Sequence, residues 1–224
     1  MKNYFIILIL SYLLSNSLDQ YSVYWFGIPM ADVTITKQDT IYNDINAIKL
    51  RFETKTNKLT STLFKVNNSY ETIINKKSFE ILSFKKSTYQ PNVTNQLYTI
   101  NSENGLIYND SINFIIPKNC FNIFSLLYYL STTPFDKIKN IVTLEREGLM
   151  YNCEIYKNNK NKHSEFELKF NLINQTDKPI IQHTDIFTWG LFKENGTKKI
   201  IVDNNKIQQC HFEFGLSHLK ANIK

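Results

Sequence analysis

Glycine is scarce in this chain of 224 residues, which contains 6 Gly and 3 Cys. The sequence has no glycine-rich phosphate loop, no G-x-S-x-G nucleophile turn and no H-E-x-x-H zinc motif. An acid pair of Asp32 with Glu145 or Glu147 is conceivable, but nothing in the sequence brings these residues together. We therefore expect no catalytic residue and no cofactor. A hydrolase with an unrecognised site remains the third hypothesis.

The three cysteines, Cys120, Cys153 and Cys210, form no C-x-x-C motif, which excludes a zinc ribbon and a disulfide framework. A single Cys120–Cys153 bridge is one option, and three buried thiols are the other. Cys210, His211 and His218 offer three potential metal ligands. Neighbours in a strand point to opposite faces, so Cys210 and His211 do not suit one ion, and we expect no metal site.

The N-terminal residues predict export. Lys2 precedes an apolar run from Tyr4 to Leu14, and Ser15 and Ser17 occupy the −3 and −1 positions of a cleavage site after Ser17. A membrane anchor is the alternative, but this run falls short of the roughly 20 residues that span a bilayer. We expect a signal peptide over residues 1–17, a single domain over 18–224, and a location in the periplasm or cell envelope, with no transmembrane segment after cleavage.

The net charge of +6 is scattered along the chain. The densest basic spots are only the pairs Lys76-Lys77, Lys85-Lys86 and Lys198-Lys199. A nucleic-acid groove concentrates basic residues on one face, so we expect no nucleic-acid partner.

Alternation of apolar and polar residues is the main structural signal. In AIKLRFET, for example, Ile48, Leu50 and Phe52 alternate with charged residues. One dry and one wet face is typical of antiparallel sheets. Strands are predicted at 21–28, 31–37, 47–54, 63–65, 70–74, 80–85, 96–100, 105–108, 112–116, 141–145, 149–156, 164–173, 186–193, 198–202 and 211–216. Asn195-Gly196 predicts a two-residue hairpin, Asp203-Asn204-Asn205 predicts a turn, and the last three strands are expected to form a meander.

One segment, PKNCFNIFSLLYYLSTTPF, has helical spacing instead. We expect a helix over about 119–131, capped by Asn119 and stopped by Pro134. It is apolar nearly all round, so it must contact apolar surface on more than one side. The predicted fold is therefore mostly β: a single curved antiparallel sheet, or open β-barrel-like domain, closed by one short covering helix. The helix is either a plug in the core or a hinged lid.

Several stretches resemble the DUF3108 family of exported bacterial proteins of unknown function. These are YSVYWFGIPMADVTI, SYETIINKKSFEILSFKKSTYQ, SLLYYLSTTPF and IFTWGLFKENGTKKIIV, and together they extend from about Tyr21 to Leu219. The resemblance implies an open antiparallel β-structure similar to envelope lipid- or lipoprotein-handling barrels, and no established activity. The segment after Tyr129-Leu130 lacks an Arg that is typical of the family, and the Pro that often ends the late hairpin is replaced near Ile200.

The aromatic residues suggest a binding function. The chain has 16 Phe and 13 Tyr, and we expect Trp25, Phe124, Tyr128, Tyr129 and Trp189 to line a cavity for an apolar small molecule, a lipid or a lipidated partner. A thick aromatic core is the alternative. The leading hypothesis is a non-enzymatic envelope protein that binds or shields such a ligand in a concave sheet. The second is a structural or interaction module of an envelope protein complex.

Overall fold

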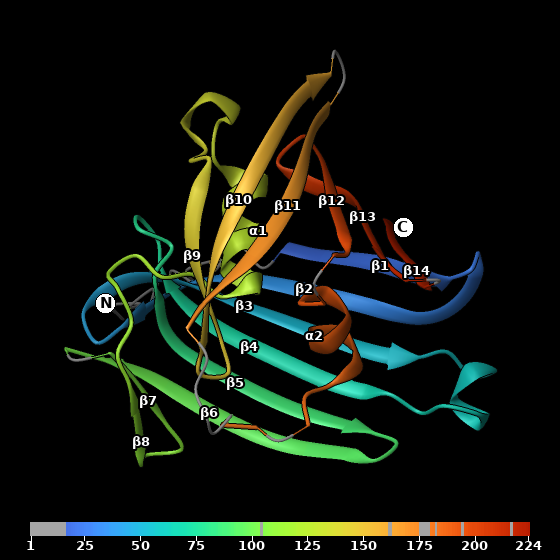
Figure 1. Cartoon of the computed structure of the whole chain (residues 1–224), viewed down its shortest axis with the longest axis horizontal. Helices are drawn as coiled ribbons and strands as arrows, with labels where there is room; N and C mark the ends of the chain where they lie inside the picture. The colour runs from blue at the N-terminus through green and yellow to red at the C-terminus, as the bar shows by residue number, and fades with distance from the viewer. Residues whose placement is uncertain are drawn as a thin grey trace, which may run out of the picture.

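The computed structural model describes residues 17–103, 105–160, 163–174, 180–181, 183–193, 195–215 and 217–224. The predicted signal peptide therefore lies, except for Ser17, outside the described residues. The described part is mainly one large sheet with two short α-helices (Figure 1). In chain order its elements are β1 (Ser17–Trp25), β2 (Ile28–Tyr42), β3 (Ile45–Thr56), the 3₁₀ turn η1 (Thr60–Thr62), β4 (Asn67–Asn75), β5 (Ile81–Gln90), β6 (Val93–Ser102), β7 (Gly105–Tyr108), β8 (Ile112–Phe114), α1 (Ile123–Thr132), the 3₁₀ turn η2 (Phe135–Lys137), β9 (Ile141–Arg146), β10 (Leu149–Lys160), β11 (His163–Asn174), α2 (Ile186–Leu191), β12 (Thr197–Asp203), β13 (Lys206–Phe214) and β14 (Ser217–Ile223).

The sheet is built from two meanders. Its strand order is β8-β7-β6-β5-β4-β3-β2-β1-β14-β13-β12-β11-β10-β9, and every pair of neighbours is antiparallel. The two meanders join where β1 pairs with β14, for example Val23 with Ala221. β8 and β9 form the two edges, so the sheet is open. The predicted antiparallel, mostly β fold is confirmed.

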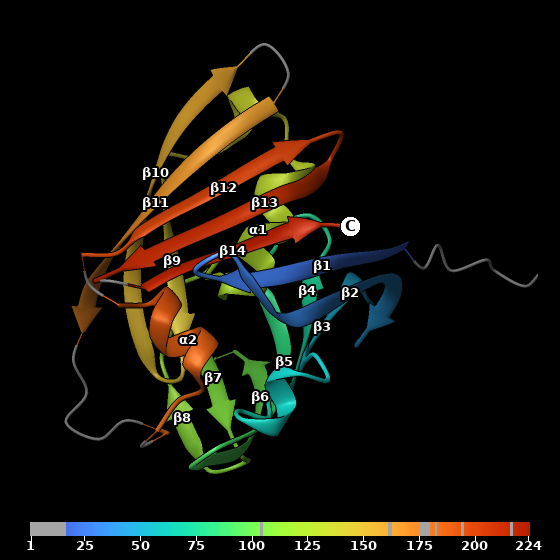
Figure 2. The same ribbon diagram turned by 90° about the vertical axis from the view of Figure 1, so that its right-hand side faces the viewer.

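The sheet bends around α1, which lies between the two meanders (Figures 1 and 2). Strands from both sides contact this helix, namely β4 from the first meander and β9, β12 and β13 from the second. The helix begins with a capping box, because the Asn122 side chain accepts from the Ser125 N–H at 2.8 Å and the Ser125 hydroxyl accepts from the Asn122 N–H at 3.0 Å. The predicted cap at Asn119 is wrong, since Asn119 sits in a turn with φ of 58° and the helix starts four residues later.

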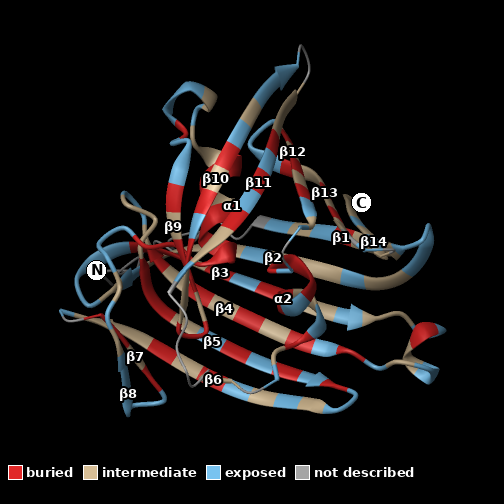
Figure 3. Cartoon of the chain, in the orientation of Figure 1, coloured by how far each residue is buried: buried red, intermediate tan, exposed pale blue. Residues whose placement is uncertain are grey.

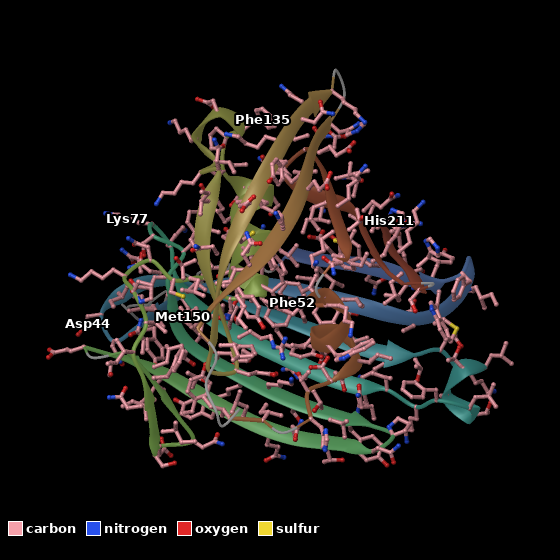
Figure 4. The ribbon with its side chains drawn as sticks, in the orientation of Figure 1. Asp44, Phe52, Lys77, Phe135, Met150 and His211 are labelled. Carbon is pink, nitrogen blue, oxygen red and sulfur yellow. The ribbon has the colours of Figure 1, made fainter. Side chains whose placement is uncertain are left out.

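Phe124 on α1 is the centre of the aromatic core. Its ring lies 4.7 Å from Phe52, 4.9 Å from Tyr70, 5.8 Å from Phe84 and 6.3 Å from Phe187 on α2, measured between ring centroids. Figure 4 shows Phe52 in the middle of the molecule, beside α1. Buried positions alternate with intermediate ones along β4 and with exposed ones along the second half of β5 (Figure 3). The prediction that an apolar sheet face wraps the helix is therefore correct.

Three local predictions are wrong. The strand predicted at 186–193 is the short helix α2, so Asn195-Gly196 closes no hairpin between strands. The strand predicted at 63–65 follows η1 in a surface turn where Leu63 is 90% exposed. The last meander consists of β12, β13 and β14, and β14 was not predicted. A short apolar run fits the helical period of 3.6 residues as well as the strand period of two, which explains the first two errors.

The turn at Asn204-Asn205 is confirmed. Both residues have positive φ, 51° and 58°, and they connect Asp203 to its partner Lys206. Asparagine tolerates this left-handed conformation, and a two-residue turn of this kind matches the twist of the flanking strands.

The proposed Cys120–Cys153 bridge is not formed, because all three cysteines are free and buried. Cys120 lies before α1, where its carbonyl accepts from the Ile81 N–H. Cys153 lies on β10 in the main core cluster. None of the helices in the described part of the chain has the length and hydropathy of a membrane span.

Candidate functional site

A buried lysine organises the polar site of the molecule. Lys86 projects inward from β5, and its side chain is 1% exposed. Its ammonium forms ion pairs with Glu147 and with Asp185, whose Oδ2 lies 2.6 Å away, and it donates to Thr184 Oγ1 at 3.0 Å. A lysine ammonium has three N–H donors. All three are therefore occupied by Glu147, Asp185 and Thr184, which together with Lys86 we call the Lys86 cluster.

Asp185 connects this cluster to α2 and to the aromatic core. It is the N-cap of α2, since its Oδ1 accepts from the Thr188 N–H at 2.9 Å and its Oδ2 accepts from the Thr188 hydroxyl at 2.7 Å. It also accepts from the hydroxyl of Tyr70 on β4 at 2.7 Å. Burial opposes ionisation of this carboxyl, but Lys86 and the Thr188 donors outweigh it and lower the pKa of Asp185. Burial, reinforced by this carboxylate, raises the pKa of Tyr70 well above 10.

A second buried carboxyl lies nearby at the β9–β10 hairpin. Glu145 accepts from the Tyr108 hydroxyl and from the Gly148 N–H, the latter at 2.9 Å. Burial raises the pKa of Glu145 from 4.5 to about 8, against the opposing hydrogen bond from Gly148. The turn residues Glu147 and Gly148 both have positive φ, 52° and 83°, which fits a two-residue hairpin turn. This turn places the Glu147 carboxylate next to the Lys86 ammonium.

The Lys86 cluster adjoins a groove on the molecular surface through Thr184. The groove has a volume of about 480 Å³, within the range of small-molecule sites. We call it the α2 groove, and it is lined by Asn92, Val93, Arg146, Ile181, His183, Thr184 and Trp189. A second hollow of about 320 Å³ adjoins it and shares four of these residues. Thr184 belongs to both the groove and the Lys86 cluster, so the groove reaches the buried charges.

Arg146 is the cationic group of the α2 groove. Its guanidinium lies 5.1 Å from the centroid of the Phe192 ring and donates to the Tyr151 hydroxyl at 3.4 Å. Its Nε lies 3.6 Å from Glu147 Oε2, too far for a hydrogen bond, and has no hydrogen-bond partner. Among the four ionised groups, the charges of Lys86 and Arg146 balance those of Glu147 and Asp185. The Arg146 side chain is 20% exposed and lines the groove, and a guanidinium in such a wall favours an anionic ligand.

The five predicted lining residues fall in three places. Phe124, Tyr128 and Tyr129 share α1, where Phe124 and Tyr129 are buried and Tyr128 is half-buried beneath the Lys37 ammonium, 5.4 Å from its ring. Trp189 lies on α2, is 46% exposed and lines the groove. Trp25 ends β1 and is 44% exposed, next to Phe26. The structure thus does not bring the five together around one cavity, and a ligand-binding role for them stays a prediction.

The polar residues of the site were missed from the sequence. Lys86 was counted only as part of the basic pair Lys85-Lys86, although it stands in phase with the inward residues Phe84, Thr88 and Gln90 of β5. This alternation could have identified Lys86, because a lysine among the inward-facing residues of a strand needs a buried partner for its charge. Glu145 and Glu147 do lie together, but Asp32 does not join them; it pairs with Lys224 at 2.8 Å on the surface.

Comparison with known structures returned a crystal structure from Brucella abortus, described as a β-barrel-like protein of domain of unknown function DUF1849. The two chains are 8% identical with a TM-score of 0.46, and the match covers 92% of this chain and 96% of the other. No curated protein matches the sequence.

Comparison with protein families is more specific. The model of DUF3108, described as a protein of unknown function, matches residues 20–171. The late Trp-containing stretch used for the resemblance lies beyond this range, and it forms α2 where a strand was expected. The matched range covers β1 (apart from its first residues) to most of β11, including the strand that carries Lys86 and the hairpin that carries Glu145 and Glu147. The chain therefore belongs to the DUF3108 family.

Proposed function

We propose that this protein is exported to the cell envelope and binds an amphiphile with an acidic head, either a free lipid or the lipid of a modified partner, in the α2 groove. The observation that supports this most is Arg146, which lines a groove of about 480 Å³ and whose side chain is 20% exposed. Val93, Ile181 and Trp189 offer apolar contact beside it. An apolar lining with a few fixed polar groups is the usual composition of a ligand site.

The Lys86 cluster has a supporting role in this proposal. The Glu147 carboxylate lies 3.6 Å from Arg146 Nε and neutralises part of the Arg146 charge. Both residues belong to the β9–β10 hairpin, which holds them on one rigid element. Because Lys86 has no N–H donor to spare, it stabilises the groove and does not act as a nucleophile. We therefore do not propose an enzymatic reaction.

Binding can be tested with a fluorescent fatty acid and its methyl ester. The acid is expected to bind the purified chain, and the uncharged ester to bind more weakly. Arg146→Gln should weaken acid binding about tenfold or more, because a hydrogen bond to a charged group contributes about 1.5–3 kcal/mol. The chain offers a matched control, Arg51→Gln, since Arg51 lies on β3 and pairs with the exposed Glu53 at 2.7 Å.

The proposal would be wrong if the acid did not bind, or if Arg146→Gln bound it as well as Arg51→Gln does. Native mass spectrometry of protein purified from its own envelope gives a second readout, in which co-purified lipid is expected. Export is tested separately by the mature N-terminus, which we expect at Leu18. An uncleaved chain in the cytoplasm would contradict it.

A role as an interaction module of an envelope complex is the second candidate. The open sheet ends in two edge strands, β8 and β9, and exposed isoleucines lie on or beside them: Ile112 at 45%, Ile115 at 77% and Ile141 at 59%. The segment before α1 covers part of β9, because Phe121 forms a parallel bridge with Leu144, so β8 is the better candidate. Unpaired edges accept strands from other proteins. In-cell cross-linking from these positions distinguishes the candidates, because one dominant protein partner at an edge favours this role.

A further inference from the structure

We propose that His211, Glu213 and His218 form a surface site for a single Zn²⁺ ion. The three side chains each offer one ligand atom, and these atoms all lie within 4.8 Å of one another. Glu213 Oε1 lies 3.2 Å from His211 Nε2 and 3.0 Å from His218 Nδ1. His211 lies on β13 and is labelled in Figure 4.

The strand register explains why the three side chains converge. His211 and Glu213 are two residues apart on β13, so they project from the same face of the sheet. His218 on β14 is the direct cross-strand partner of Glu213. Cys210, which was considered as a ligand, points to the other face and is buried in the core. The ligand set is therefore held by a backbone ladder and does not depend on a flexible loop.

The distances fit a four-coordinate ion. Zinc binds histidine nitrogen and carboxylate oxygen at about 2.0–2.2 Å, so two ligands of a tetrahedral site lie about 3.4 Å apart. The two N···O distances are already close to this value, and the two histidine nitrogens, which lie within 4.8 Å of each other, need to approach further when an ion binds. Imidazole suits zinc, and two histidines with one glutamate leave an open position for water or another donor.

The surroundings of the three side chains determine how tightly the site is expected to bind Zn²⁺. The side chains of His211, Glu213 and His218 are 33%, 37% and 52% exposed, so solvent reaches the site. Lys199 and Lys220 lie on either side of His211 in the neighbouring strands, and their charge opposes cation binding. Glu165 neutralises Lys199 at 2.9 Å. We therefore expect binding weaker than that of a buried structural zinc site, and one ion per chain.

The neighbouring aromatic residues provide a reporter. The His218 ring contacts Phe26 edge-on at 5.7 Å, and Phe26 lies 5.5 Å from Trp25. Trp189 is the second tryptophan of the chain and lies on α2. In a Trp189→Phe background, Co²⁺ bound at the site is expected to quench Trp25 fluorescence and to show the visible absorption of a coordinated ion.

The test uses the full chain without an affinity tag. Isothermal titration with Zn²⁺ should give one site, which His211→Ala and His218→Ala abolish and Glu213→Gln weakens at least tenfold. His163→Ala is the matched control, since His163 begins β11 away from the site, and it should bind as the wild type does. Circular dichroism verifies that each variant is folded. The proposal is overturned if the wild type binds no Zn²⁺, or if the two histidine variants retain wild-type binding.

Discussion

Replacing Glu145 by glutamine is expected to remove a large part of the pH dependence of stability above about pH 5. Glu145 is 5% exposed, and burial raises its pKa from 4.5 to about 8. It therefore stays protonated in the folded state at neutral pH, whereas in the unfolded chain it ionises. Because the folded pKa is the higher one, the protonated carboxyl contributes its full stabilisation of the fold below the unfolded pKa of 4.5. This stabilisation decreases as the pH rises and is lost once the pH passes the folded pKa of about 8.

The size of the effect follows from the two pKa values. Between about pH 5 and about pH 7.5 the unfolded carboxyl is mostly ionised, while the folded one largely keeps its proton. One pKa unit corresponds to about 1.4 kcal/mol, so the folded state loses about 3 kcal/mol over this interval. A glutamine keeps the carbonyl oxygen that accepts from Tyr108 and from the Gly148 N–H, and it cannot ionise.

The measurement is urea unfolding of wild type and Glu145→Gln at several pH values. We expect the variant to lie within about 1 kcal/mol of wild type at the acidic end, and the difference in its favour to grow by about 3 kcal/mol toward about pH 7.5. Glu167→Gln, which removes an exposed carboxylate of β11, is the control. A difference between Glu145→Gln and wild type that does not change with pH would refute a buried, protonated carboxyl at this position.

Three further changes test the interior. Lys86→Met should cost about 3–5 kcal/mol in the free energy of unfolding, because it leaves two buried carboxylates without their cation, whereas Lys85→Met on the outer face should cost little. Phe124→Ala should lower the free energy of unfolding by about 3–5 kcal/mol. Phe26 is 55% exposed, so Phe26→Ala should lower it by less than about 1 kcal/mol. Equal losses for the two variants would contradict the central position of α1. The three cysteines should react with a thiol reagent only in denaturant, and any disulfide found by mass spectrometry under native conditions would contradict this.

Local patterns predicted most of the sheet because alternation reports directly on which face of a strand is buried. β3, β7 and β11 were predicted close to their observed bounds for this reason. β14 carries the same signal, with Leu219, Ala221 and Ile223 alternating with polar residues, but it was overlooked. The pairing of β1 with β14 has no local signal, since it joins residues nearly 200 positions apart.

The helix α2 shows that the spacing of apolar residues alone does not always distinguish a helix from a strand. Its six residues, IFTWGL, form a short apolar run that fits a strand as well as a helix. A cap signal was present, because Asp185 stands three residues before Thr188 and both side-chain oxygens of Asp185 accept from it. The partners of Asp185, by contrast, come from β4 and β5 and emerge only from the folded sheet. The polar site was therefore beyond reach of sequence patterns, apart from the inward phase of Lys86.

The junction of β1 with β14 has a consequence for how the molecule assembles. Each meander grows by adding a strand beside the previous one, which needs only short loops to close. The seam between the first and last strands closes a loop of nearly the whole chain, and such contacts form late and slowly. Until residues 217–223 are synthesised, β1 and β13 lack the strand that lies between them, and a chaperone that binds unpaired strand edges would act in this interval.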